Sequence, residues 1–184
     1  MADGAVLGPG LGQSAWAHGL WRHLLRTDLP LVLDADGLNL LAAEPLERGN
    51  WVLTPHAGEG ARLLAWSGAD AVQRDRGAAA KELARRYRAT VVLKGPNTLV
   101  ATPRADDPLH VCDRGNPGMA TAGTGDVLAG VLGSLLVQTR DLELAARAGV
   151  LMHALAGDAA AASGERGTLA SDLLPHLREW ANPS

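Results

Sequence analysis

The chain has 184 residues, of which 47% are hydrophobic and 20% are charged, as is typical of one globular domain with a sizeable core. The formal net charge of -3 argues against the basic face of a nucleic-acid-binding protein. Cys112 is the single cysteine, so no intrachain disulfide forms, and no apolar run reaches the roughly 18 residues of a membrane-spanning helix. We therefore expect residues 1–184 to form one cytoplasmic domain that binds neither nucleic acid nor membrane.

Short apolar runs alternate with longer stretches of helical periodicity, a pattern typical of a layered α/β domain. Continuous apolar runs predict buried parallel strands with helices on both faces of the sheet, and they lie at residues 5–7, 31–33, 51–53 and 91–93. Helical patterns lie at residues 14–26, 58–66, 71–88, 124–138, 142–162 and 170–180. Residues 98–101 and 109–112 predict two more strands in a small antiparallel meander.

Polar or glycine-rich segments follow the predicted parallel strands directly, at residues 8–12, 34–36, 54–59 and 94–98. In an open α/β sheet, ligands bind beyond the carboxyl ends of the strands, so these segments are the first candidates for a site. The segment GPGLG at residues 8–12 imitates a dinucleotide fingerprint. Its G-x-G-x-G spacing nevertheless lacks the helix-packing glycine of G-x-G-x-x-G.

The strongest motif is NPGMATAGTGD at residues 116–126, which the apolar stretch VLAGVLGSLLVQ follows at once. Its glycines allow a ligand to approach the backbone, and the first-turn amides of the following helix lack intrahelical acceptors. We therefore predict a phosphate site at Gly123, Thr124 and Gly125. Asp126 has two interpretations: a carboxylate that accepts a proton from a hydroxyl, or, with Thr124 as the cap, a residue that merely complements the helix dipole.

Several segments occur together in an order that resembles the ADP-dependent NAD(P)H-hydrate dehydratase family, a branch of the ribokinase-like fold. Besides NPGMATAGTGD they are GPGLG at 8–12, LDADGLNLL at 33–41, LTPHAGE at 53–59, VLKGPNT at 92–98 and GERGTLASDLL at 164–174. The resemblance implies a ribokinase-like α/β sheet and the ADP- or ATP-driven dehydration of hydrated NADH or NADPH. It also implies Mg²⁺ and a homotetramer.

The same resemblance implies roles for individual residues. Asp126 is implied to be the catalytic base and a substrate contact, and Gly125 a nucleotide contact. The KGxxT segment implies nucleotide binding by Lys94, Gly95, Pro96, Asn97 and Thr98. Substrate contacts are implied for Gly10, Gly12 and His56, while Glu59 takes the place of an acid near magnesium and the phosphates.

These residues also have plainer interpretations. Lys94 alone would be a strand-end lysine that extends to solvent, and His56 alone would be a capping or hydrogen-bonded turn residue. Asp34 and Asp36 could help to hold magnesium, although we favour Asp36 as the cap of the short helix that follows. His153 lies in a long alanine-rich helix and is interpreted as a core or interface residue.

Members of the family have a substantial segment before GPGLG, whereas this motif begins here at Gly8. We therefore expect either an N-terminally truncated form or a piece cut from a longer protein, whose sheet has an unpaired edge unless another subunit covers it. Two alternatives to the dehydratase stay open at this point. One is a small-molecule kinase of the same fold that acts on a thiazole alcohol or a sugar, and the other is a non-catalytic nucleotide-binding remnant.

Overall fold

The computed structural model describes residues 2–182 and contains one mixed six-stranded sheet in the order β1-β2-β3-β4-β5-β6. Its first four strands are parallel: β1 (Ala5–Leu7), β2 (Leu31–Leu33), β3 (Trp51–Leu53) and β4 (Thr90–Leu93). Strands β5 (Thr98–Ala101) and β6 (His110–Cys112) pair antiparallel beyond β4, so the predicted meander extends the same sheet. At the opposite edge, β1 pairs with β2 alone among the described residues.

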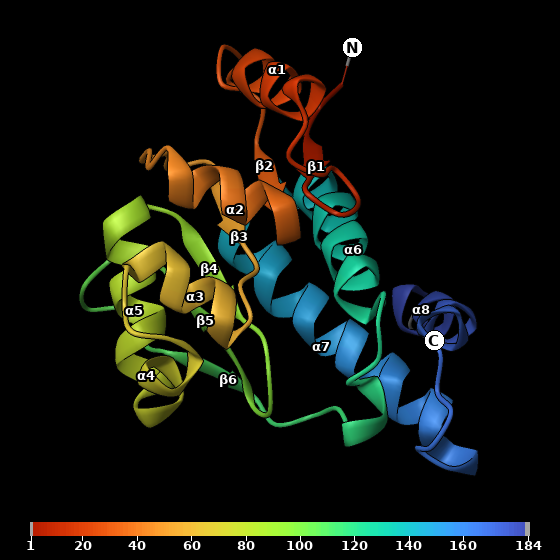
Figure 1. Cartoon of the computed structure of the whole chain (residues 1–184). Helices are drawn as coiled ribbons and strands as arrows, with labels where there is room; N and C mark the ends of the chain where they lie inside the picture. The colour runs from red at the N-terminus through yellow and green to blue at the C-terminus, as the bar shows by residue number, and fades with distance from the viewer. Residues whose placement is uncertain (1, 183–184) are drawn as a thin grey trace.

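Helices cover both faces of this sheet, as the continuous apolar strands predict (Figure 1). They are α1 (Ala15–Leu24), α2 (Ala35–Ala43), α3 (Ala57–Leu64), α4 (Ala69–Arg74), α5 (Arg76–Tyr87), α6 (Thr124–Thr139), α7 (Leu142–Ala160) and α8 (Leu173–Ala181). The first five helices connect the parallel strands on one face, while α6 and α7 cover the other. None of the helices between residues 2 and 182 has the length and apolarity needed to cross a membrane.

Each face of the sheet has its own hydrophobic core because side chains alternate along a strand. Val32, Val52 and Val92 lie at the strand centres and pack with buried side chains of α6 and α7. Their neighbours along the strands, such as Leu33 and Leu93, pack with the helices of the other face. Every central strand is therefore buried on both sides, which explains why its apolar sequence is continuous.

The helical pattern at residues 71–88 corresponds to two helices, α4 and α5, so the prediction of one long helix is wrong. The break lies at Asp75, whose backbone leaves the helical region with φ -148° and ψ 85°. Its carboxylate accepts a hydrogen bond of 2.8 Å from the Ala78 amide and caps α5. An aspartate side chain competes in this way with the helical bonds of the main chain, and periodicity alone does not detect the competition.

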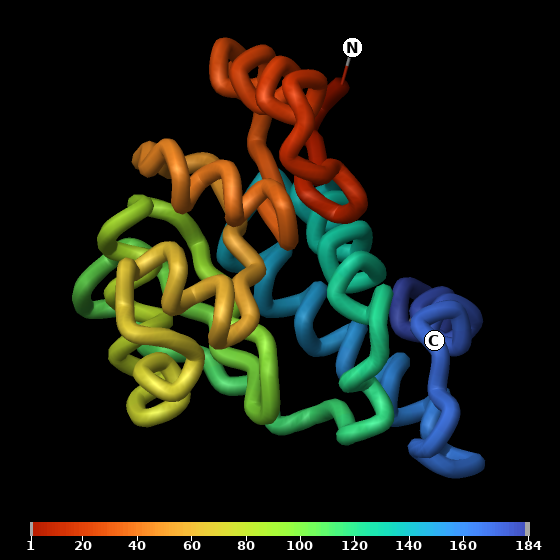
Figure 2. The backbone as a smooth tube through the Cα atoms, viewed as in Figure 1, coloured from red at the N-terminus to blue at the C-terminus, as the bar shows by residue number. Residues whose placement is uncertain are grey.

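The connection from β6 to α6, residues 113–123, carries the chain along one end of the molecule to the face covered by α6 and α7 (Figure 2). It places the start of α6 against the residues that follow β2 and β4. A Cβ atom built on Gly125 would lie 3.3 Å from Lys94 Nζ and 3.7 Å from Asp34 Oδ2. The polar segments after these two strands therefore converge on the first turn of α6.

Candidate active site

A cavity of about 490 Å³ lies beside the start of α6. The segment from Lys94 to Thr98 contributes to its lining, as do residues 113–117, 119 and 120, and Thr124, Gly125 and His153 help to complete the wall. This volume falls in the range of roughly 300–1,000 Å³ that is usual for small-molecule sites. The other predicted site residues lie outside the lining: Gly10, Gly12, His56, Glu59, Gly123 and Asp126.

The first turn of α6 is open to a ligand because no side chain caps it. Gly123 occupies the N-cap position in the left-handed region, with φ 91°, and has no side chain to offer. The Thr124 hydroxyl oxygen instead lies 2.8 Å from the carbonyl oxygens of both Met119 and Thr121, to which it can donate its single hydrogen. The interpretation of Thr124 as a cap is therefore wrong. The Thr124 amide bonds weakly to the Thr121 carbonyl at 3.5 Å, whereas the amides of Gly125 and Asp126 have no hydrogen-bond partner within residues 2–182 and are available to an anion.

Asp126 lies in the same first turn and is exposed. Its carboxylate takes part in none of the hydrogen bonds or ion pairs found within residues 2–182. An exposed carboxylate without a structural partner is free to contact a ligand or to accept a proton. The role of Asp126 as a catalytic base stays a prediction.

Lys94 lies at the end of β4 and forms a buried ion pair. Its Nζ is 2.5 Å from Asp34 Oδ1 and 3.9 Å from Glu59 Oε2. The Asp34 carboxylate follows β2 and is almost fully buried, while the Lys94 side chain is 19% exposed. The interpretation of Lys94 as a lysine that extends to solvent is therefore wrong, because Asp34 holds the ammonium next to the first turn of α6.

Asp36 holds the GPGLG loop and does not cap a helix. The interpretation of Asp36 as the cap of the short helix that follows it is therefore wrong. The N-cap residue of α2 is Asp34, which makes no side-chain cap bond. The Asp36 carboxylate accepts a 2.8 Å bond from the Gly12 amide. This bond holds the pKa of the Asp36 carboxyl below its ordinary value, so the carboxylate stays charged at neutral pH.

In the GPGLG loop, one glycine is packed closely against neighbouring backbone and two glycines have free space around them. A Cβ atom on Gly8 would lie 1.6 Å from the Asp34 carbonyl oxygen, so the loop packs directly on the start of α2. Gly10 and Gly12 have positive φ values of 66° and 70°, and a Cβ atom on either would meet nothing within 4 Å. The backbone at these two glycines is accessible, and their contact with a substrate stays a prediction.

His56 caps α3, which confirms its interpretation as a turn residue. Its Nδ1 accepts bonds from the amides of Gly58 and Glu59, at 3.0 and 3.3 Å. In return, Glu59 Oε2 accepts a 2.8 Å bond from the His56 amide, which completes a capping box. The side chain is 58% exposed, so the outer edge of the ring can still contact a ligand, and that contact stays a prediction.

Glu59 is the residue implied to lie near magnesium, and its carboxylate is buried beside Lys94. Residues 2–182 contain no group of three or more His, Cys, Asp or Glu side chains arranged to hold a metal ion. Mg²⁺ commonly binds one or two carboxylates and completes its octahedron with water and substrate phosphates. Glu59 is thus compatible with a Mg²⁺ ion held mainly by bound phosphates and water, whereas the Asp34 carboxylate is already paired with Lys94.

Arg76 shapes the segment from Lys94 to Thr98 and was missed by the sequence analysis. Its guanidinium donates to the carbonyl oxygens of Leu93 at 3.1 Å, Lys94 at 3.3 Å, and Pro96. Burial lowers the pKa of this guanidinium without removing its charge. No sequence signal distinguishes Arg76 from the other arginines, because its partners are main-chain atoms about 20 residues away.

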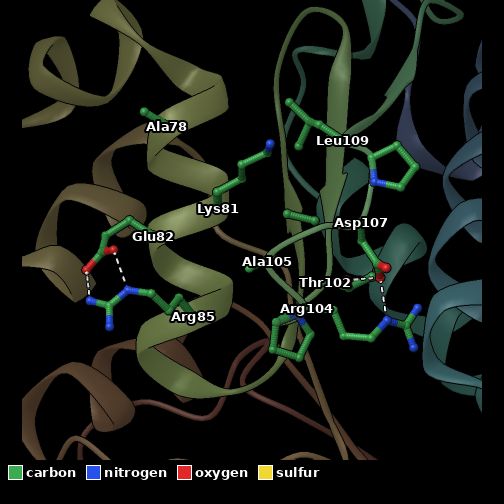
Figure 3. Close-up of a pocket in the computed structure, with 12 residues that line it drawn as sticks. Ala78, Lys81, Glu82, Arg85, Thr102, Arg104, Ala105, Asp107 and Leu109 are labelled. Carbon is green, nitrogen blue, oxygen red and sulfur yellow. Dashed lines mark hydrogen bonds and ion pairs between the residues drawn. The ribbon is translucent and has the colours of Figure 1, made fainter.

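A second hollow, of about 280 Å³, lies between α5 and the β5–β6 connection (Figure 3). Its charged groups largely neutralise one another, because Glu82 pairs with Arg85 at 2.7 Å and Asp107 pairs with Arg104 at 2.6 Å. Compared with the first turn of α6, the residues around this hollow offer few free groups to a phosphate. We therefore place the candidate active site at the larger cavity.

Related proteins match this chain over most of its length. A family model described as NAD(P)H-hydrate dehydratase matches residues 1–179. A bifunctional NAD(P)H-hydrate repair enzyme of Coxiella burnetii is 52% identical over 179 residues, which cover 97% of this chain and 36% of that protein. An ADP-dependent (S)-NAD(P)H-hydrate dehydratase of Neisseria meningitidis is 45% identical, over 96% of this chain and 62% of that protein. The chain thus spans less than two thirds of the length of either relative.

Solved structures confirm the ribokinase-like architecture. An ADP/ATP-dependent NAD(P)H-hydrate dehydratase from Bacillus subtilis, co-crystallised with ATP/Mg²⁺, matches with a TM-score of 0.82 and 29% identity, over 96% of this chain and 63% of that one. A ribokinase-like superfamily protein from Enterococcus faecalis gives the same TM-score at 27% identity, over 99% of this chain and 65% of that one. Sequence and structure therefore agree that the chain belongs to the NAD(P)H-hydrate dehydratase family.

Proposed function

We propose that this chain dehydrates hydrated NADH or NADPH in a reaction driven by ADP or ATP. The observation that carries the proposal is the uncapped first turn of α6, with the Lys94 ammonium near its amides and the exposed Asp126 carboxylate in the turn. The amides and the ammonium suit a phosphate, and the carboxylate suits a hydroxyl group that must lose its proton. The names of the related proteins support the choice of substrate.

The nucleotide would occupy the 490 Å³ cavity, along Lys94 to Thr98, with its terminal phosphate at Gly123, Thr124 and Gly125. The hydroxyl oxygen of the hydrated nicotinamide attacks this phosphorus, and the bond from phosphorus to the bridging oxygen of the nucleotide breaks. Asp126 accepts the hydroxyl proton. Phosphate then leaves with the electrons of its C–O bond while the neighbouring ring carbon loses a proton, which restores the ring double bond. With ADP, the products are AMP, phosphate and NADH or NADPH.

Positioning and charge stabilisation are the main contributions of a protein to such a transfer. The buried Asp34 carboxylate holds Lys94, and the Arg76 guanidinium holds the carbonyl groups of the nucleotide segment. Gly10, Gly12 and His56 would contact the hydrated nicotinamide nucleotide. Mg²⁺, held by Glu59 together with the phosphates, would neutralise part of the phosphate charge.

The test is to incubate the chain with hydrated NADH, Mg²⁺ and either ADP or ATP, and to follow the recovery of dihydronicotinamide absorbance. We expect recovery with one or both nucleotides and none after chelation of Mg²⁺. A phosphorylated product without recovery would identify a kinase. Bound nucleotide without any reaction would identify a non-catalytic protein.

Substitution of Asp126 tests the role of the carboxylate separately. We expect Asp126→Ala to reduce turnover by about 10²–10⁴-fold, the usual contribution of a general base, while ADP binding by calorimetry stays within about threefold of the parent chain. Loss of binding and turnover together would instead give Asp126 a structural role.

We further propose that residues 1–184 act as one nucleotide-binding domain and assemble as a cytoplasmic homotetramer. The resemblance to the family supports the tetramer, and the single cysteine is compatible with a reducing compartment. Exposed apolar side chains such as Trp16, Leu144 and Leu151 offer surface for subunit contacts. Light scattering coupled to size exclusion measures the number of subunits directly.

A further inference from the structure

His153 is a buried histidine of α7 that the proposed reaction does not use. It is 8% exposed and lines the cavity at the start of α6. Its Nε2 lies 2.9 Å from the main-chain carbonyl oxygen of Thr124, the first residue of α6. A polar side chain of α7 is thus joined to the phosphate-binding turn of a different helix.

The partner of His153 determines where the ring carries its proton. A carbonyl oxygen can only accept a hydrogen bond, so the hydrogen must lie on Nε2. Burial lowers the pKa of His153 to about 4, so the ring is neutral at physiological pH and Nδ1 is a bare acceptor. Nδ1 makes no hydrogen bond within the described residues, so the bond from Nε2 is the polar contact that the ring makes there.

The bond from Nε2 holds the first turn of α6, whose amides must point toward the phosphate in the proposed site. Thr124 is flanked by Gly123 and Gly125, whose lack of a Cβ leaves the backbone of the turn poorly restrained. The Thr124 hydroxyl fixes the turn from the side of Met119 and Thr121, and His153 fixes its carbonyl from the side of α7. Together these bonds set the direction of the free amides that follow.

We propose that His153 is a positioning residue for the phosphate-binding turn, which it holds through the bond from Nε2–H to the Thr124 carbonyl. This inference rests on the proposed nucleotide site. It assigns to His153 a contribution to the binding of the nucleotide's terminal phosphate, and not to the binding of its nucleoside. Because the His153 ring is neutral, Lys94 and not His153 supplies the electrostatic attraction for the phosphate.

Two amide variants separate the two ring nitrogens. In His153→Gln, the terminal NH₂ lies close to the former Nε2 and can still donate to Thr124. In His153→Asn, the amide lies close to the former Nδ1 and does not reach the carbonyl. His153→Leu removes both polar atoms and keeps an apolar side chain of similar size in the core.

The experiment measures the affinity of each variant for ADP and for adenosine, together with the thermal midpoint without ligand. We expect His153→Gln to bind ADP within about threefold of the parent chain, and the Asn and Leu variants to bind it roughly tenfold more weakly, as the loss of one hydrogen bond predicts. Adenosine has no phosphate, so its affinity should change by less than twofold in all three.

Equal ADP affinity in the parent chain and His153→Asn would overturn the inference, and so would a Gln variant as weak as the Leu variant. Equal losses of affinity for ADP and for adenosine would show that His153 contributes only to the packing of the core. Failure of the parent chain itself to bind ADP is a different result, because it refutes the nucleotide site and with it the proposed function.

Discussion

Lys94 and Asp34 form an ion pair that links two strands at the active-site end of the sheet. The two residues are 60 positions apart in the sequence, and their side-chain atoms are 2.5 Å apart. The Asp34 side chain is 2% exposed, so its charge depends on Lys94 for compensation. The pair positions the ammonium and at the same time couples the site to the stability of the fold.

The stability of the Asp34→Asn variant tests this coupling. The substitution keeps the shape of the side chain but removes the nearer of the two carboxylates beside Lys94 and leaves only Glu59 at 3.9 Å, so we expect the free energy of unfolding to fall by about 3 kcal/mol. Urea denaturation measures the loss. Glu82→Gln, in an exposed pair with Arg85, is the matched control and should change little. Equal effects of both variants would show that Asp34 is not a buried partner.

His153 contributes a second residue-scale effect, on stability against acid. Its pKa is about 4 in the folded chain and lies near 6.5 in the unfolded chain, because burial disfavours the charged ring. As pH falls from about 6.5 to 4, the unfolded chain gains a proton at this position before the folded chain does. The stability present above pH 6.5 is therefore lost on acidification, by up to roughly 3 kcal/mol.

The measurement is the urea midpoint of the parent chain and of His153→Gln between pH 7.5 and 4.5. The difference between them isolates the histidine from the carboxyl groups that both chains share. We expect this difference to grow in favour of the variant as pH falls. A constant difference across the range would mean that His153 titrates alike in the folded and unfolded chains.

At the scale of elements, the loop between β1 and α1 packs on the start of α2 through Gly8. The φ of Gly8 is +137°, and a Cβ atom there would lie 1.6 Å from the Asp34 carbonyl oxygen. The Gly12 amide donates to Asp36 and holds the far end of the same loop. The glycines of GPGLG thus have different tasks, close packing at Gly8 and a left-handed backbone at Gly10 and Gly12.

Alanine at two of these glycines separates the tasks. Gly8→Ala must displace the start of α2, and we expect it to destabilise the chain by about 3 kcal/mol or more, from overlap and backbone strain together. Gly10→Ala meets no atom within 4 Å and should cost only the left-handed strain of roughly 1–2 kcal/mol. Thermal midpoints compare the two variants. A Gly10→Ala variant as unstable as Gly8→Ala would contradict this division.

At the scale of the whole molecule, a strand is recognisable from its sequence when both faces of the sheet bury it. The continuous apolar runs at residues 5–7, 31–33 and 51–53 match β1, β2 and β3. Helices bury β2 and β3 on both sides, whereas Val6 of the edge strand β1 is 40% exposed. The ends of helices are harder to predict from patterns of apolar residues. The division of α4 from α5 depends on one Asp75 side chain and its bond to an amide three residues away.

The sequence alone determined the alternation of strands and helices and the family, and it predicts a phosphate site at the turn of residues 123–126, because these depend on local patterns of glycine, polar and apolar residues. Only the tertiary structure decided that Asp34 holds Lys94, that Arg76 shapes the segment that follows β4 and that His153 reaches Thr124. Each of these bonds joins residues 17 to 60 positions apart. A buried charge or ring pairs with whichever group lies next to it in the packed chain, and the spacing of residues along the sequence does not predict which group that is.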